Sequence, residues 1–111
     1  MPNAKLYVDQ RLWSARQADI EALLGPMRDL ICNDLSVTPA ACQIAAIPCI
    51  GLADQPPLNL ELAILPKPDR TRDLLTGFGE RMRALFAGPM GDAAMAVRIV
   101  TLDAATYVAV K

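Results

Sequence analysis

Two stretches of the chain alternate apolar with polar or small residues, which is the pattern of a β-strand with one buried face. The first covers 4–8, directly behind Pro2, and the second covers 58–64. Residues 42–48 form an almost continuous apolar run, which is typical of a strand buried on both faces. A fourth strand is predicted over 95–101, and a short terminal strand over 107–110.

Between these strands, apolar residues recur every three or four positions, which predicts amphipathic helices. The first helix is expected to begin at Ser14, because Ser14 and Gln17 have the spacing of a capping box, and 9–13 would then be a connector. Pro26 lacks the amide that would bond to the preceding turn, so we expect a kink or a split there. The apolar face of this helix comprises Ile20, Leu23, Leu24, Met27, Leu30 and Ile31.

The second helix is predicted to begin at about Thr71, and Gly88 with Pro89 supplies its stop signal. Pro66 and Pro68 end the strand that precedes it. The apolar face of this helix comprises Leu74, Leu75, Phe78, Met82, Leu85 and Phe86.

The order is therefore strand, helix, strand, and then the same again, in halves of about 1–53 and 54–111. This order predicts a single α/β (α+β) domain over 1–111 in which each half is a right-handed unit of two parallel strands and a helix. The two units would share one four-stranded mixed sheet with both helices on one face. Since 53% of the residues are hydrophobic and nothing is left to cover the other face, we expect subunits to pack sheet against sheet.

Charge and composition exclude several functions. The net charge is −1, with 11 basic and 12 acidic side chains and no long block of one sign, which argues against nucleic acid as a partner. Residues 35–53 are uncharged, but Pro39, Pro48 and Gly51 interrupt them, so no membrane span is predicted. Three cysteines without a CxxC pair, together with the lack of a leader pattern, favour a reducing cytoplasm.

Histidine is absent, which removes Ser-His and Cys-His nucleophile pairs and the commonest zinc ligand, so no metal site is predicted. Pro2 offers a different chemistry. Removal of Met1 would leave Pro2 with a free secondary amine, and an apolar site would lower the pKa of that amine towards neutrality. An amine with such a pKa is suited to general base catalysis.

Four features together carry a resemblance to a known family: Pro2 with the strand 4–8, the turn 37–39, the loop 66–72 and the terminal stretch 102–110. In their order and spacing the chain resembles the tautomerase superfamily, close to the 5-carboxymethyl-2-hydroxymuconate isomerase and macrophage migration inhibitory factor families. That resemblance implies a homotrimer of sheets surrounded by helices. It also implies a cofactor-free tautomerase or isomerase in which Pro2 is the catalytic base acting on a small carboxylate-bearing substrate.

The resemblance also implies residues that bind substrate. Arg70 best matches the arginine that the family places before its second helix, with Lys67 and Arg72 as neighbours that could take its role. Arg11 is offset by about one residue from the position where 4-oxalocrotonate tautomerase has a substrate-binding arginine. Tyr107 could donate a phenolic hydroxyl from a neighbouring subunit. If Arg70 binds substrate, its loss would weaken the binding of dicarboxylates. As a cation at a helix start it is expected to be solvated, so its loss would change the stability of the fold little.

Two alternatives remain open. Two strand-helix-strand units are also the order of ferredoxin-like domains, so the chain could be a non-catalytic module, ferredoxin-like or tautomerase-like, that binds a small ligand. Alternatively, decarboxylases and hydrolytic dehalogenases of the same superfamily use the proline in its protonated form, as an acid.

Overall fold

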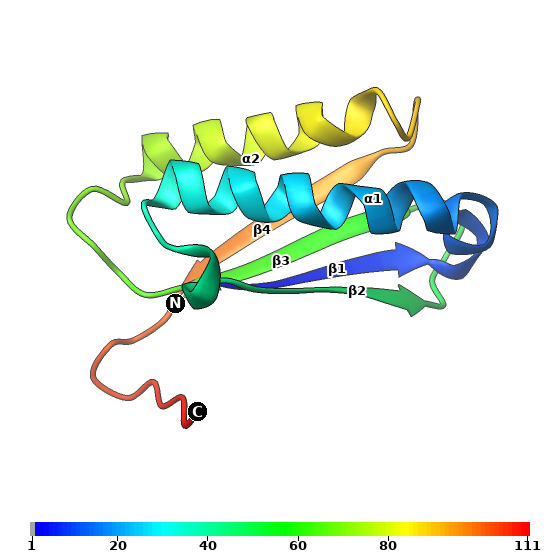
Figure 1. Cartoon of the computed structure of the whole chain (residues 1–111). Helices are drawn as coiled ribbons and strands as arrows, with labels where there is room; N and C mark the ends of the chain where they lie inside the picture. Colours follow the sequence, from blue (N-terminus) through cyan, green and yellow to red (C-terminus); the bar gives the residue numbers. More distant parts are fainter. Residues whose placement is uncertain (1) are drawn as a thin grey trace.

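The computed structural model describes residues 2–111, in which two helices lie on one face of a four-stranded sheet (Figure 1). Met1, on whose removal the amine hypothesis depends, lies outside the described residues. In chain order the elements are β1 (Asn3–Asp9), α1 (Gln10–Leu35), a 3₁₀ turn (Pro39–Ala41), β2 (Gln43–Cys49), β3 (Leu58–Ile64), α2 (Arg72–Ala87) and β4 (Met95–Thr101). The predicted strand-helix-strand repeat is confirmed.

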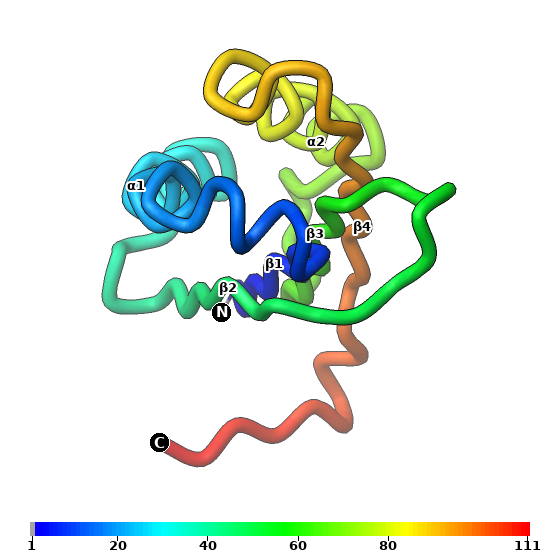
Figure 2. Tube along the Cα trace, turned by 90° about the vertical axis from the view of Figure 1, so that its right-hand side faces the viewer, coloured from blue at the N-terminus to red at the C-terminus, as the bar shows by residue number. Residues whose placement is uncertain are grey.

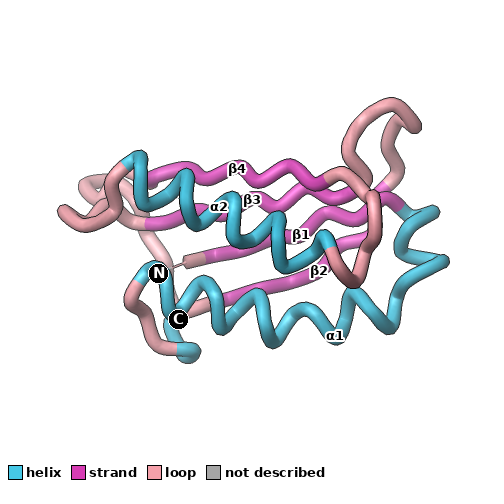
Figure 3. The backbone as a smooth tube through the Cα atoms, turned by 90° about the horizontal axis from the view of Figure 1, so that it is seen from above, coloured by secondary structure: helices cyan, strands magenta, loops and turns pink. Residues whose placement is uncertain are grey.

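The strands lie in the order β2-β1-β3-β4, with β1 parallel to β2 and β3 parallel to β4 (Figure 3). The two central strands, β1 and β3, are antiparallel. The sheet is therefore mixed, as predicted, and both helices cover the same face (Figure 2). A consequence for the site is that β1 begins at the end of the sheet where β3 and β4 finish.

The core lies between the helices and the sheet. Alternate residues of the two central strands face the helices, and burying each such aliphatic side chain stabilises the fold by roughly 1.5–3 kcal/mol. The residues with the least exposure include Leu6, Val8, Leu60, Leu62, Ile64, Ile20, Met27, Ile31, Phe78, Met82 and Phe86. The predicted bounds of β3 and β4 are those observed, and α2 begins directly after its predicted cap, where the Thr71 hydroxyl accepts from the Leu74 N–H at 3.2 Å.

The start of α1 differs from the prediction. Residues 9–13 are not a connector, because β1 runs to Asp9 and α1 begins at Gln10. The Asp9 carboxylate accepts from the Arg11 N–H at 2.9 Å and so caps the helix. Because one aspartate both ends the strand and caps the helix, no connector in the sequence marks the boundary between them. Ser14 and Gln17 have the spacing of a capping box but do not cap the helix.

The expected kink at Pro26 is also wrong. Within α1 the non-helical residue is Arg16, with φ −135° and ψ 26°, two positions beyond the predicted start at Ser14. Pro26 and Ala22 both lie on the exposed side of the helix, so water can satisfy the Ala22 carbonyl that Pro26 leaves without an amide. Met27, next to Pro26, is fully buried, and its packing keeps the helix against the sheet.

Two strand predictions need correction. β2 is an edge strand in which each residue is either exposed or half-buried, so it is not buried on both faces. Residues 107–110 form no strand in this chain. Instead, the C-terminal tail leaves the end of β4 on the side of the sheet away from the helices, and its Val108 and Val110 are exposed (Figures 1 and 2).

The sheet face away from the helices is polar along its centre. Lys5 on β1 pairs in register with Glu61 on β3, and Glu61 pairs with Arg98 on β4, so the three charged residues form one row across the sheet. All three are exposed. The large exposed apolar residues lie mainly elsewhere, with Ile50 and Leu52 after β2 and three more in the C-terminal tail.

Candidate active site

Pro2 lies at the amino end of β1, in the middle of the sheet. It is buried, and its carbonyl accepts a hydrogen bond of 3.0 Å from the Gln43 N–H at the start of β2. This bond extends the β1–β2 ladder by one step beyond Asn3, which pairs with Gln43 in register. The backbone of Pro2 is thus fixed by the sheet, and the direction of its nitrogen is set by the strand.

The topology brings most of the predicted substrate-binding residues to the Pro2 end. The loop with Lys67 and Arg70 follows β3, and the tail with Tyr107 follows β4, and both strands finish beside the start of β1. Arg11 lies at the opposite end, directly after β1. A strand of seven residues spans roughly 20 Å, so within one chain Arg11 does not join Pro2.

The Arg70 guanidinium is half-buried and bound by backbone carbonyls rather than solvated as predicted. Its Nη1 donates to the Leu65 carbonyl at 2.6 Å, and its Nη2 donates to the Leu35 carbonyl at 3.2 Å. Leu35 is the last residue of α1, so a cation there also opposes the negative end of the helix dipole. Nε is buried without a hydrogen-bond partner in the described chain. Arg70 therefore joins the end of α1 to the end of β3.

Lys67 is placed differently, in the same loop. Its side chain is exposed, and within 2–111 no hydrogen bond or ion pair engages its ammonium group. The Lys67 carbonyl accepts from the Arg70 N–H at 3.0 Å, which closes the turn that presents both side chains. Tyr107 is 38% exposed in the C-terminal tail, where its N–H donates to the Asp103 carbonyl at 2.9 Å. Both side chains are thus open to a ligand or to a second chain.

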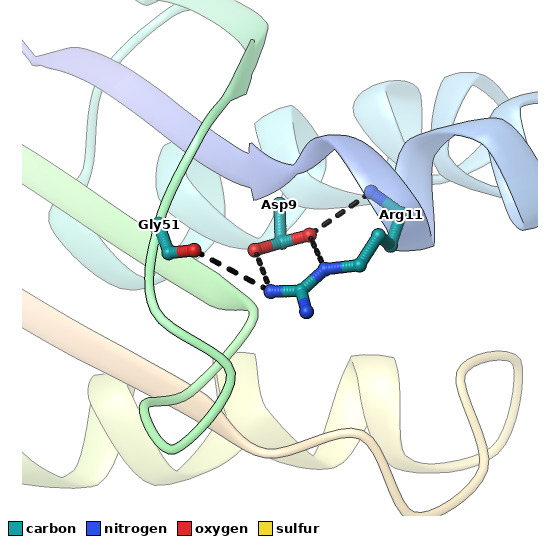
Figure 4. Close-up of polar contacts among 3 residues, drawn as sticks. All are labelled: Asp9, Arg11 and Gly51. Carbon is teal, nitrogen blue, oxygen red and sulfur yellow. Dashed lines mark hydrogen bonds and ion pairs between the residues drawn. The ribbon is translucent and has the colours of Figure 1, made fainter.

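At the other end of β1, Arg11 is held by Asp9 (Figure 4). Nε and Nη2 of Arg11 each donate to one oxygen of the Asp9 carboxylate at 2.9 Å, and Nη2 also reaches the Gly51 carbonyl at 3.4 Å. The hydrogen bonds from the Arg11 side chain, and to a smaller extent the one from its backbone N–H, lower the pKa of Asp9 from 3.8 to about 2. The pairing leaves Arg11 electrically compensated, and it ties the start of α1 to the loop after β2.

Two cations near Pro2 were not identified from the sequence as site residues. A cavity of about 270 Å³ on the open face of the sheet is lined by Asn3, which follows Pro2, and by Lys5, Glu61 and Arg98. The signal was present in the alternation, which places Lys5 and Arg98 on the side opposite the apolar residues. It could be used only with the strand order, because the register of β1, β3 and β4 is what aligns the three charges.

A larger groove of about 810 Å³ runs between α2 and β4. Its apolar lining includes Leu75, Val97 and Ile99. Four arginines also line it: Arg70, Arg72, Arg83 and Arg98. Opposing them is the single carboxylate of Glu80. The groove extends to Thr101, the last residue of β4, and so reaches the end of the sheet that carries Pro2. It is an electropositive surface suited to anions.

Residues 2–111 contain neither clustered metal ligands nor a helix that could span a membrane. No three histidine, cysteine, aspartate or glutamate side chains there gather closely enough to hold a metal ion. None of the helices in that range has the length and apolar character needed to cross a membrane.

Comparison with known proteins identifies the fold. No protein-family model matches the chain, and no curated protein matches it significantly in sequence. Among solved structures, a macrophage migration inhibitory factor-like protein from Entamoeba histolytica superposes with a TM-score of 0.74 at 7% identity, over 97% of this chain and 94% of that one. A fused 4-OT, a wild-type symmetric trimer, superposes with a TM-score of 0.72 at 11% identity, over 95% and 91%.

These similarities extend over nearly the whole chain, and they confirm the resemblance found in the sequence. The chain has the tautomerase fold that macrophage migration inhibitory factor-like proteins and fused 4-OT share. A protein of unknown function from Vibrio cholerae is similar to the same degree, with a TM-score of 0.74 at 14% identity, over 97% of this chain and 83% of that one. At such identities the likeness concerns the fold.

Proposed function

We propose that the protein is a cofactor-free tautomerase or double-bond isomerase in which Pro2, once Met1 is removed, is the general base. The observation that carries the proposal is the position of Pro2: buried, at the start of a central strand, in a tautomerase fold. Burial disfavours the charged ammonium form and so lowers the pKa of a free prolyl amine. The cations at this end of the sheet, Lys67, Arg70 and Lys5 among them, act in the same direction.

The substrate we propose is a small 2-oxo or 2-hydroxy-dienoic acid. The Pro2 nitrogen would take the proton of the 2-hydroxyl group, or a proton on a carbon next to the carbonyl, and return it to another carbon of the conjugated system. The substrate carboxylate would be held by Lys67, whose ammonium group has no partner within 2–111, while Arg70 supplies a fixed positive charge beside it. Both charges stabilise the enolate that forms when the proton leaves the 2-hydroxyl oxygen or the carbon.

Association of chains is part of the proposal. Arg11 and Pro2 lie at opposite ends of β1, so only a second chain could bring Arg11 to the Pro2 of the first. Fused 4-OT proteins that are similar in structure form symmetric or asymmetric trimers, and we propose a homotrimer here. Sedimentation equilibrium at micromolar concentration should give the mass of three chains, and a monomer would remove this part of the proposal.

The catalytic role is tested by following the ketonisation of phenylenolpyruvate and of 2-hydroxymuconate by absorbance. Processed protein, with the loss of Met1 verified by mass, should accelerate at least one reaction. Pro2→Ala should lose roughly 10²- to 10⁴-fold, because a positioned base contributes about that much and the remaining primary amine is placed less well. Alanine, like proline, allows removal of Met1, so the two proteins differ only in the amine.

A preparation that retains Met1 is the second control, because acylation removes the basic lone pair of Pro2 while the rest of the chain is unchanged. It should be less active than Pro2→Ala. If processed protein gives no rate above buffer with either substrate, or if Pro2→Ala matches wild type, the base assignment fails. A folded, ligand-binding but inactive protein would then point to the non-catalytic module.

A further inference from the structure

The outer edge of β4 is a surface that the proposed mechanism does not use. β4 is the last strand of the sheet, and within residues 2–111 it pairs with β3 alone (Figure 3). The backbone N–H and C=O groups along its other edge therefore have no strand partner, and such an edge is a template for a further extended segment. β4 contains no proline or glycine, whereas Pro48 removes a donor from the opposite edge strand, β2.

The groove between α2 and β4 follows this edge along the whole strand. It has a volume of about 810 Å³, and every residue of β4 except Val100 lines it. The wall formed by α2 consists of residues that share one face of the helix, namely Arg72, Leu75, Thr76, Gly79, Glu80 and Arg83. The groove can therefore hold an extended segment about as long as β4 itself.

The two walls run in opposite directions, because α2 begins at the end of the sheet where β4 finishes. In the middle, Gly79 lies opposite Val97, since a Cβ at position 79 would be 3.8 Å from the Val97 side chain. Arg72 therefore flanks the carboxyl end of β4, and Arg83 flanks its amino end. The groove thus has an apolar middle with a cation at each end.

The cations of the groove have no strong carboxylate partner. Arg72 is exposed, and within 2–111 no hydrogen bond or ion pair engages its guanidinium group. Arg83 meets Glu80 at 3.5 Å, but both side chains are more than half exposed, so this pair is weak. Arg98 donates to the side-chain oxygen of Asn59 at 2.5 Å, which is a neutral partner. The groove is therefore complementary to an acidic ligand.

We propose that this groove binds an acidic, extended segment of a partner protein, which adds to the edge of β4 as a further strand. The backbone of the segment would bond to the free edge of β4, and its carboxylates would meet Arg72 and Arg83. Residues 72 and 83 are roughly 16 Å apart along a helix, and the first and fifth residues of a strand are roughly 13 Å apart. The preferred sequence therefore has two acidic residues at that spacing and, midway between them, an apolar residue that faces Val97.

A second copy of this chain fits the groove less well. The other free edge strand, β2, carries no charged residue. The loop 50–57 and the tail 102–111 each contain a single aspartate. Pairing of two β4 edges would bring the arginines of two grooves together, which like charges disfavour. Charge complementarity therefore favours a partner with a different, acidic sequence.

The test measures the binding of a labelled peptide with blocked ends, Thr-Glu-Thr-Val-Thr-Glu-Thr, to the full chain by fluorescence anisotropy. In a strand, its two glutamates and its valine share one face. Wild type should bind this peptide, and should bind the analogue with glutamine in place of glutamate roughly tenfold more weakly. Amide hydrogen exchange should show new protection within Met95–Thr101, because strand addition forms its bonds there.

Arg83→Glu is the sharpest variant, because Arg83 lies at the end of the groove away from Pro2. It should bind the glutamate peptide roughly tenfold more weakly, and it should bind a lysine analogue better than wild type does. That gain requires a folded chain. Arg28→Glu, at an exposed position on α1, is the charge-matched control and should bind as wild type does. Pro2→Ala should also bind normally, so the result is independent of the proposed catalysis.

Three results would overturn the proposal. The first is no binding at millimolar peptide, and the second is equal affinity for the glutamate and glutamine peptides. The third is protection by the peptide that lies outside β4. If Met95–Thr101 is already protected in an assembled wild-type protein without peptide, a second copy occupies the edge, and the proposal fails as well.

Discussion

The two ends of β1 each carry an arginine that binds structural groups, but the groups differ. At the Pro2 end, Arg70 donates to the carbonyls of Leu35 and Leu65, which are neutral. At the other end, Arg11 is paired with the Asp9 carboxylate. No carboxylate within 2–111 forms an ion pair with Arg70, whereas Arg11 is paired with a carboxylate. Of these two arginines, only the one at the Pro2 end is without a carboxylate partner.

Under the proposed function, this difference would let the same residue type serve two purposes. A fixed cation disfavours a second positive charge nearby and attracts a carboxylate, which are the two effects that a prolyl base with an acidic substrate requires. A compensated pair provides neither effect, but it positions the start of α1. An arginine predicted from sequence to bind substrate can thus be assigned only when its partners are known.

The substitution Arg70→Ala tests this comparison and is expected to have the largest effect. The substitution removes two hydrogen bonds from a charged donor and leaves the carbonyls of Leu35 and Leu65 unpaired in a half-buried site. The free energy of unfolding should fall by about 2 kcal/mol. Urea denaturation measures it, and Arg72→Ala, an exposed cation two residues away, should change it by less than about 0.5 kcal/mol. Equal stability of both variants would mean that Arg70 is a solvated cation after all.

Lys67→Ala sharpens the comparison at the same end. An unpartnered ammonium group contributes nothing to the fold within 2–111, so stability should stay within about 0.5 kcal/mol of wild type. Binding of a dicarboxylate should weaken roughly tenfold, which corresponds to one hydrogen bond to a charged group. Calorimetric titration measures the affinity, with Arg28→Ala, an exposed cation on α1, as the charge-matched control. If Arg70→Ala loses affinity and Lys67→Ala does not, Arg70 takes the role.

The smallest effect is expected at the opposite end, from Asp9→Asn. The pKa of Asp9 is lowered from 3.8 to about 2, so its charged form stabilises the fold fully above the ordinary pKa, and this contribution is lost as the pH falls through about 2. Asparagine caps a helix about as well but does not titrate. The unfolding free energy of Asp9→Asn should therefore vary less with pH between about 4 and 2. Asp54→Asn, in the exposed loop after β2, should follow wild type, and a wild-type slope in Asp9→Asn would exclude the ion pair as its source.

The sequence predicted the regular part of the fold well, because its patterns are local. The alternation over Leu58–Ile64 and the capping threonine before α2 each determine an element within a few residues. The errors occur where one residue belongs to two elements, or where exposure to water decides. Asp9 ends β1 and caps α1 at once, and Pro26 is tolerated inside α1 because its exposed side lets water replace a missing bond.

The candidate site was predicted less completely. Pro2 could be singled out because its chemistry depends on its place in the chain. Arg70 was expected to be solvated, since a charge pattern carries no information about two carbonyls contributed by α1 and by the end of β3. Lys5 and Arg98 could be recognised only with the register of the sheet, because they are far apart in sequence and are aligned through Glu61.

The polar row of Lys5, Glu61 and Arg98 affects the order of events after synthesis. A face that is charged along its centre has little tendency to collapse onto another chain, so we expect a single copy to complete its core before it meets a second one. Assembly then becomes a separate step governed by concentration, rather than a condition for folding. If a neighbouring copy completes the site, dilution would abolish the activity while each chain remains folded. Turnover per chain would then rise with protein concentration.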